Sequence, residues 1–193
     1  MSDNPYAFIC RIHPREQTAA REAIEKALLE LYAQRDVSRI SVKELCARAS
    51  VARSTFYAYY GIVDDCLADI ENRAAAGLVS LNSELLGSVP VCELDLDFIR
   101  RTVEYIQENQ QLFRLFLVER PNSRFIEKWK AGIKYHLYGR MAHVGGHNME
   151  LTLEMLASEA LGAYRYWLTE QYELDLEYVK KLLSRTLEAY TEQ

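Results

Sequence analysis

The segment 41–60 carries the pattern that most restricts how this chain folds. Ser41 is a favourable helix N-cap, and Glu44, three residues later, completes a capping box. The pattern predicts a short helix over 42–49, a tight turn, and a second short helix over 52–60. Apolar side chains recur on the faces that these helices would turn toward each other, namely Val42, Leu45, Cys46, Val51, Phe56 and Tyr60. The sequence therefore predicts a helix-turn-helix.

The rest of the chain is also helical in pattern. Apolar residues recur at three- and four-residue spacing in the long segments, and no segment shows sustained alternation with β-branched residues. Only 8 glycines and 4 prolines interrupt the 193 residues. We therefore expect an all-α protein of about nine helices. One helix is predicted to begin near Arg15, ahead of the helix-turn-helix. The helices predicted after it cover 63–86, 95–110, 111–119, 122–142, 149–171 and 175–191.

These elements divide the chain into three expected parts. Residues 1–14 are predicted to be an irregular arm, 15–61 a helix-turn-helix domain, and 62–193 a helical dimerisation and effector domain with its clearest linker at 87–94. Residues 1–60 carry 9 basic and 7 acidic side chains, whereas the remainder carries 14 and 21. A slightly basic head on an acidic body suits a protein that meets phosphates with one end only.

Composition argues against several other classes. Hydrophobic residues make up 49% and charged residues 26%, which is typical of a globular chain. No apolar stretch approaches the roughly 18 residues that cross a bilayer, so no membrane partner is expected. The 4 cysteines stand far apart without a CxxC pair, which favours reduced thiols in a cytoplasmic protein over disulfides or a zinc site. No nucleophile–base pair, phosphate-binding glycine loop or metal-ligand set is present, so we expect neither an enzyme nor a cofactor.

The outward face of the second short helix has the chemistry of a DNA-reading surface. No Asp or Glu occurs between Arg48 and Gly61, so no carboxylate there repels phosphate. Arg53 is suited to a guanine edge or a phosphate, and the hydroxyl groups of both helices are suited to phosphates. The residues expected to contact double-stranded DNA are Ser41, Val42, Lys43, Arg53, Ser54, Thr55, Tyr57, Ala58 and Tyr59.

The segment 41–60 reads SVKELCARASVARSTFYAYY. This run closely resembles the DNA-binding signature of the TetR family of bacterial regulators, and the resemblance extends over about residues 17–70. A stretch at 161–168 is similar to the penultimate helix of many members. The resemblance implies a transcription regulator that binds a palindromic operator as a homodimer, by default a repressor, with possible control by a small molecule.

The same resemblance assigns roles and exposes departures. It implies that Arg53 contacts DNA and that Tyr57 and Tyr59 touch phosphates. Three residues depart from the usual pattern, namely Ser50 for a turn glycine, Ala52 for a capping serine and Val63 for a phosphate-binding lysine. Ser50 weakens the turn at a cost of about 1 kcal/mol, and Ala52 cannot cap the second helix. We therefore expect modest DNA affinity, and the alternative is a helical protein–protein interaction module or co-regulator whose helix-turn-helix no longer binds DNA.

The aromatic residues of the middle helices allow two interpretations. They form the core of a helical bundle or, as the resemblance implies, they line an effector cavity. The residues considered for such a cavity are Tyr105, Phe113, Phe116, Trp129, Tyr135 and Tyr164.

The last two predicted helices each have an apolar face. Such faces are either buried within the monomer or, as the resemblance implies, form a four-helix dimer interface with a second copy. One helix carries its apolar face on Leu153, Leu156, Ala160 and Tyr164. The residues expected at the interface are Leu161, Gly162, Tyr166, Leu183 and Leu187.

Overall fold

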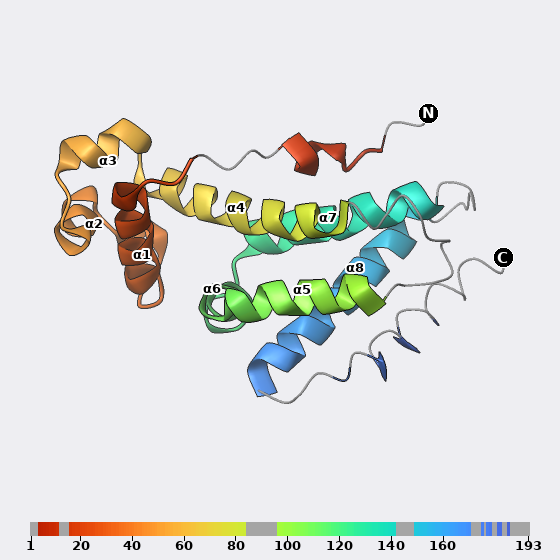
Figure 1. Cartoon of the computed structure of the whole chain (residues 1–193). Coiled ribbons are helices and arrows are strands. Elements are labelled where there is room, and N and C mark those ends of the chain that lie inside the picture. Colours follow the sequence, from red (N-terminus) through yellow and green to blue (C-terminus); the bar gives the residue numbers. More distant parts are fainter. Residues whose placement is uncertain are drawn as a thin grey trace. The chain divides into compact units, whose positions relative to one another are not determined.

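The computed structural model is helical throughout the part of the chain that it describes (Figure 1). The described residues are 4–11, 16–83, 96–141 and 149–170, with the single positions 175, 177, 178, 181, 182 and 185. No strand occurs among them, which confirms the all-α prediction. Within the same residues, no helix combines the length and apolar character that a membrane crossing requires.

Contacts group the chain into two compact units. The helix-turn-helix unit comprises residues 12–74, and the C-terminal unit comprises residues 1–11 together with 75–193. The division falls inside one helix, α4 (Val63–Ser83). The domain limits expected from the sequence, at residues 14 and 61, stay predictions.

The helix-turn-helix unit is built from short helices whose ends follow from local hydrogen bonding. It contains α1 (Ala19–Tyr32), the 3-10 turn η2 (Val37–Arg39), α2 (Val42–Ala49), α3 (Arg53–Tyr59) and the first part of α4. The predicted bounds of α2 are confirmed. The first helix begins later than Arg15, where the sequence placed its start, because the side chain of Thr18 accepts a hydrogen bond from the Arg21 amide at 3.3 Å and caps α1.

All four helices contribute to the apolar core of this unit. Six of its side chains are at most 1% exposed, and burial of such side chains is the main favourable contribution to folding. They are Ile24, Leu28, Leu45, Phe56, Cys66 and Leu67.

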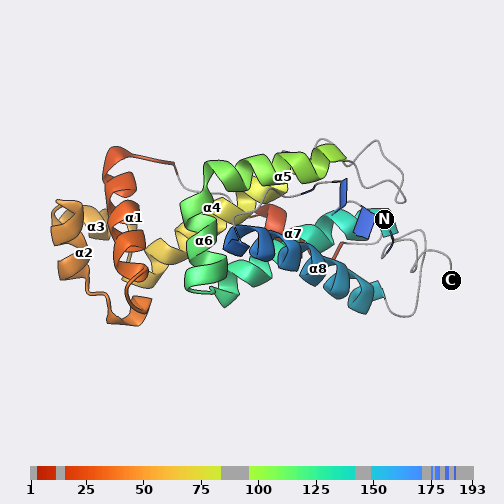
Figure 2. The ribbon, with the colours of Figure 1, turned by 90° about the horizontal axis from the view of Figure 1, so that it is seen from below.

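The C-terminal unit is a bundle in which α7 and α8 lie side by side (Figure 2). The helix predicted over 111–119 is two pieces, because the Arg120 amide bonds the Leu115 carbonyl at 2.8 Å and converts the last turn to π geometry. The linker at 87–94 and most of the helix predicted at 175–191 lie outside the described residues. Besides the end of α4, the unit contains η1 (Ala7–Arg11), α5 (Leu96–Glu108), α6 (Gln110–Arg114), the π-turn η4 (Leu115–Glu119), α7 (Ser123–Met141) and α8 (Met149–Glu170).

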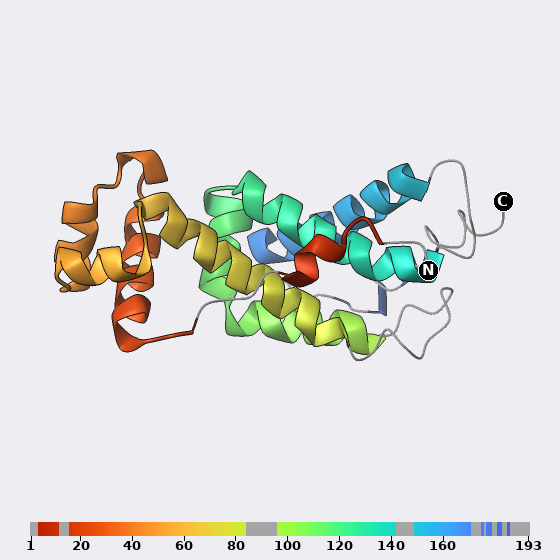
Figure 3. The same cartoon turned by 90° about the horizontal axis from the view of Figure 1, so that it is seen from above.

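The N-terminal segment, expected to be irregular, forms the 3-10 helix η1 and packs on α7 (Figure 3). The Asn4 side-chain amide donates to the carbonyl oxygen of Tyr135 at 2.9 Å. Ile9 is 1% exposed, so η1 covers apolar surface of the C-terminal unit. Its short apolar run is the physical reason for the difference from the expected irregular arm, because that run gains burial by packing on a distant helix.

One carboxylate joins α7 to α8. Glu154 of α8 accepts a hydrogen bond from Lys130 Nζ at 2.6 Å and pairs also with Lys134, both on α7. These bonds, that from Lys130 foremost, lower the pKa of Glu154 to about 2. The ion pairs therefore favour contact between the two helices wherever Glu154 is ionised.

Replacing Glu154 by Gln should lower the Tm of the protein at neutral pH but change it little near pH 2. The carboxyl group has an ordinary pKa of 4.5 and a pKa of about 2 in the fold, so its contribution to stability is present above pH 4.5 and is lost as pH falls through about 2. The Glu154 side chain is 39% exposed, so solvent screens the pairs and the shift should be only a few degrees. Thermal melts followed by circular dichroism from pH 7 to pH 2 measure it.

Glu127→Gln is the matched control, because Glu127 is 68% exposed and its carboxylate lies 4.0 Å from Lys130 Nζ. It should show no pH-dependent difference from the wild type. Equal pH dependence in both variants would contradict the assignment to Glu154.

Candidate nucleic-acid interface

The turn between α2 and α3 requires a left-handed residue, and Ser50 supplies it. Ser50 has φ 55° and ψ 38°, and no other non-glycine residue in the described part of the chain has a positive φ. The Val51 amide bonds the Cys46 carbonyl at 3.0 Å and the Ser50 amide bonds the Ala47 carbonyl at 3.3 Å. This is a Schellman motif, whose left-handed position glycine fills most easily. The departure from a turn glycine therefore falls where its conformational cost is highest.

The other two departures also have visible consequences. Ala52 precedes α3 and makes no side-chain capping bond. Val63 is 7% exposed and belongs to the core, so this position offers no phosphate contact. The start of α4 is capped by Asp65, whose carboxylate accepts hydrogen bonds from the Gly61 and Ile62 amides at 3.0 Å each.

None of the residues predicted to contact DNA is buried. Between them on α3, Phe56 is 0% exposed, which fixes the inner face of this short helix. Three predicted residues are half-buried, namely Val42, Thr55 and Tyr59. The exposed ones are Ser41, Lys43, Arg53, Ser54, Tyr57 and Ala58. Their contact with DNA itself stays a prediction.

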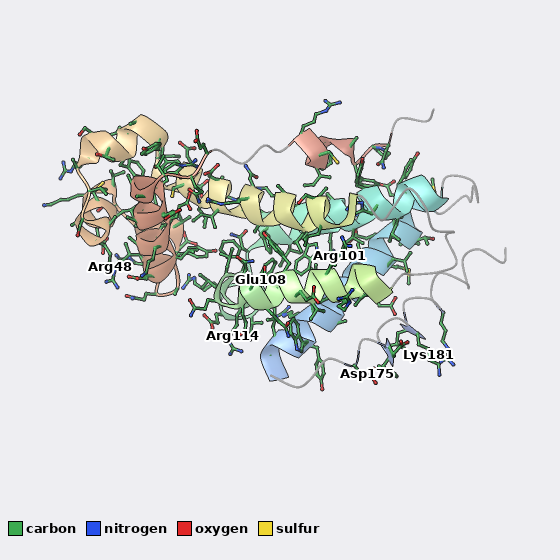
Figure 4. The ribbon with its side chains drawn as sticks, viewed as in Figure 1. Arg48, Arg101, Glu108, Arg114, Asp175 and Lys181 are labelled. Atoms are coloured by element: carbon green, nitrogen blue, oxygen red, sulfur yellow. The ribbon has the colours of Figure 1, made fainter. Side chains whose placement is uncertain are left out.

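Half of the lysines and arginines among the described residues of this unit form ion pairs within it. Four side chains pair with carboxylates of the unit, namely Arg21, Arg35, Arg48 and Arg73. For example, Arg48 Nε lies 2.8 Å from a carboxylate oxygen of Glu30 (Arg48 is labelled in Figure 4). The other cations of residues 16–74 are exposed and form no ion pair with a described residue, namely Lys26, Arg39, Lys43 and Arg53. Two of these, Lys43 and Arg53, lie on the helix-turn-helix and are available to phosphate or base edges.

Tyr59 is held by the beginning of α1. The Thr18 hydroxyl donates to Tyr59 Oη at 3.1 Å, and the Arg21 guanidinium carbon lies 5.9 Å from the centre of the Tyr59 ring. Thr18 was not among the site residues expected from the sequence. A threonine ahead of a helical pattern indicates an N-cap, but no local pattern indicates that its hydroxyl meets a residue 41 positions away.

The unit also buries charged side chains that sequence analysis missed. Arg21 is 2% exposed, and Glu25 and Asp69 are each 7% exposed. The available signal was spacing, because Arg21 continues the apolar stripe of α1 that includes Ile24 and Leu28. A charge on such a stripe either points to solvent or finds a buried partner. The partner, Asp69, is distant in sequence.

The cysteines of this unit are buried neutral thiols. Cys46 lies inside α2 at 3% exposure, and burial raises its pKa above the ordinary value. Cys66 is 0% exposed, and burial, followed by the charge of Glu25, raises its pKa to about 12. Neither thiol is ionised at neutral pH, so both act as packing groups.

The residues considered for an effector cavity separate into two groups. Four of them are buried in the C-terminal unit, namely Phe113, Phe116, Trp129 and Tyr164. They pack within one aromatic cluster: Trp129 stacks on Tyr164 with ring centres 5.4 Å apart and meets Phe113 at 5.4 Å. Tyr105 and Tyr135 are half-buried. These contacts belong to a bundle core, and the effector cavity stays a prediction.

The predicted dimer residues are placed on different sides of α8. Leu161 is 8% exposed, whereas Tyr166 is 63% exposed and Gly162 is exposed with no neighbour within 4 Å of an added Cβ. Leu183 and Leu187 lie outside the described residues. The apolar face expected from the sequence is buried within the unit and therefore presents no surface to a second copy: Leu153, Leu156, Ala160 and Tyr164 are at most 9% exposed.

Solved structures to which the chain is similar include transcription regulators. The chain is similar to a TetR-family transcriptional regulator from Streptomyces coelicolor, with 17% identity, a TM-score of 0.62, and 92% of this chain and 83% of that chain covered. FadR, the fatty acid degradation regulator from Bacillus halodurans, has 15% identity and a TM-score of 0.60, with 90% and 96% covered. The dihydroxyacetone kinase operon activator DhaS has 19% identity and a TM-score of 0.56, with 90% and 96% covered.

No family model matches the sequence, and no curated protein matches it. At identities this low, structural similarity establishes the fold and leaves the activity to be argued from the site. The chain has the all-α fold of TetR-family transcription regulators, as its resemblance in sequence predicted.

Replacing Ser50 by Gly should stabilise the protein by about 0.5–1 kcal/mol, because glycine adopts the left-handed conformation without the clash of a Cβ. Urea unfolding at 25 °C measures the change. Ala47→Gly is the control: Ala47 is exposed inside α2, where glycine should destabilise by about 1 kcal/mol. Shifts of the same sign in both variants would contradict strain at Ser50.

Proposed function

We propose that the protein is a transcription regulator that binds double-stranded DNA through α2 and α3. The observation that carries the proposal is the outward face of α3, which is free of acidic residues and flanked by two exposed cations, Lys43 and Arg53, that make no ion pair with a described residue. The fold it shares with solved transcription regulators supports the same conclusion. Contact with phosphates requires such exposed cations, whereas a protein-binding face does not.

The side chains on this face have complementary tasks. Arg53, at the first turn of α3, is proposed to reach a guanine edge in the major groove. Lys43 and the hydroxyl groups of Ser41, Tyr57 and Tyr59 are proposed to bind phosphates and so fix the register of the helix. Val42, Ser54, Thr55 and Ala58 complete the contact surface.

Arg53→Ala should weaken binding to the preferred duplex by about 1–3 kcal/mol and weaken binding to random DNA less. The preferred duplex is obtained by selecting random double-stranded DNA with the full-length wild type, and affinities are measured by mobility shift at several salt concentrations. Lys26→Ala is the control, because it removes the same charge from an exposed position on α1. Equal losses on selected and random DNA would make Arg53 a phosphate contact.

The same titration tests the alternative of an interaction module whose helix-turn-helix no longer binds DNA, which the strained Ser50 and uncapped Ala52 favour. If the wild type bound selected and scrambled duplexes equally at every salt concentration, the regulator proposal would fail.

We also propose that two copies associate through the outer face of α8. This face exposes apolar side chains at helical spacing, with Leu151 58%, Met155 47% and Tyr166 63% exposed. Gly162 lies among them and contacts nothing that a Cβ would disturb, although glycine inside a helix costs about 1 kcal/mol relative to alanine. Close approach of a second helix explains a glycine here. A two-fold dimer would present two copies of α3 to a palindromic operator.

Gly162→Leu should weaken the dimer at least about tenfold, because its side chain fills the space that a closely crossing helix would occupy. Sedimentation velocity across a concentration series measures the dissociation constant. Gln107→Leu is the control, because it adds the same side chain at an exposed position of α5. A wild type that stays monomeric at high micromolar concentration would contradict the dimer.

Regulation is proposed to follow from this architecture. DNA binding by default represses transcription, and a small molecule bound in the C-terminal unit would shift the population between DNA-binding and non-binding arrangements. The support is the resemblance of the sequence to TetR regulators. One similar structure is named as an operon activator, so transcription in vitro with and without the protein decides the direction.

A further inference from the structure

The helix-turn-helix unit contains a buried network centred on the Arg21 guanidinium. Arg21 Nε donates to the Tyr60 hydroxyl at 3.2 Å, and its Nη2 pairs with Asp69 and lies 3.9 Å from a carboxylate oxygen of Glu25. The Tyr60 hydroxyl in turn donates to Glu25 Oε1 at 3.0 Å. One guanidinium therefore joins α1 to α4 and to the residue that ends α3.

The network is electrically balanced. Arg73 pairs with Glu25 Oε2 at 2.6 Å, so Arg21 and Arg73 face the two carboxylates of Glu25 and Asp69. Burial raises the pKa of the Tyr60 hydroxyl, which keeps it a neutral donor. With its charges matched, the network avoids the cost of an unpaired buried charge.

Stability alone does not account for this network. Removing two charges from water roughly cancels their attraction, and apolar side chains of similar volume often stabilise a fold equally well. The unit already has a core of side chains that are at most 1% exposed. What a guanidinium network adds is geometric specificity, because its planar N–H groups donate only to acceptors at a few positions.

The buried network contacts residues at the edge of the proposed DNA-contacting face. Tyr60 follows Tyr59, and the Arg21 guanidinium carbon lies 5.6 Å from the Tyr60 ring and 5.9 Å from the Tyr59 ring. Thr18, which caps α1 by accepting from the Arg21 amide, donates to Tyr59 Oη. The beginning of α1 therefore makes two contacts with Tyr59, through the Thr18 hydroxyl and the Arg21 guanidinium.

We propose that Arg21 and Tyr60 are positioning residues for DNA recognition, which act by fixing the Tyr59 hydroxyl and the end of α3 at the height of a phosphate. This inference rests on the proposed DNA-binding function. Arg21 is buried and makes no contact with DNA; its effect passes through Tyr59.

The first test replaces the central pair without changing net charge. Arg21→Met with Asp69→Leu removes one cation and one anion and leaves the Arg73–Glu25 pair in place. We expect a Tm close to that of the wild type and affinities for both the selected and the random duplex about tenfold lower, because a misplaced phosphate contact weakens binding to every sequence. The control, Arg48→Gln with Glu30→Gln, removes an ion pair between α1 and α2 that touches neither tyrosine and should leave both affinities unchanged.

The second test uses hydroxyl deletions, which keep the ring packing intact. Tyr60→Phe and Tyr59→Phe are measured singly and together on the selected duplex, with Tm as a check of folding. If Tyr60 acts through Tyr59, Tyr60→Phe should weaken binding several-fold in the wild type and have no further effect in the Tyr59→Phe background. This cycle decides the inference even if the double replacement of Arg21 and Asp69 prevents folding.

The outcomes separate the inference from the function on which it rests. A wild type without preference for the selected duplex would refute the proposed function. A wild type with that preference, together with Tyr60→Phe binding as tightly as the wild type, would overturn the inference alone. Additive losses from the two tyrosine variants would also overturn it, because Tyr60 would then act independently of Tyr59.

Discussion

The arrangement of the helix-turn-helix unit depends on the buried pairing of Arg21 with Asp69. The pair joins the first turn of α1 to the second turn of α4, and Arg21 Nε also donates to the Tyr60 hydroxyl at the end of α3. Apolar contacts press these helices together but allow small shifts between them, because dispersion and hydrophobic burial have no preferred direction. The ion pair and its hydroxyl partner restrict those shifts. The orientation of the outward face of α3 thus depends on a buried charge, that of Arg21.

This anchoring makes the two ends of α3 unequal. At its beginning, Ala52 provides no cap and Ser50 holds a strained conformation. At its end, Tyr60 is 2% exposed and bonded to a rigid cluster. The residue proposed to read a base, Arg53, sits at the weakly held end, and the residue proposed to bind phosphate, Tyr59, at the firmly held one.

The sequence predicted the features that local physics determines. The capping box at Ser41 located α2 to the residue, and the glycine missing at Ser50 indicated a position with positive φ. Features that depend on distant partners were not predictable. Nothing local to Arg21 reveals that Asp69, 48 residues away, neutralises it. The apolar face of α8 was visible, but an amphipathic stripe does not tell which neighbour covers it, and Leu153 and Leu156 proved to be covered within the unit.

Because η1 packs on α7, the C-terminal unit is built from two separate segments of the chain, and the helix-turn-helix unit lies between them in sequence. The polypeptide starts in the C-terminal unit, enters the helix-turn-helix unit after Arg11, and returns through α4. A fragment cut from Met1 to Ala74 would contain η1 but not α7, on which η1 packs, and would expose the apolar side chain of Ile9 to water. An isolated DNA-binding fragment is therefore better started after η1.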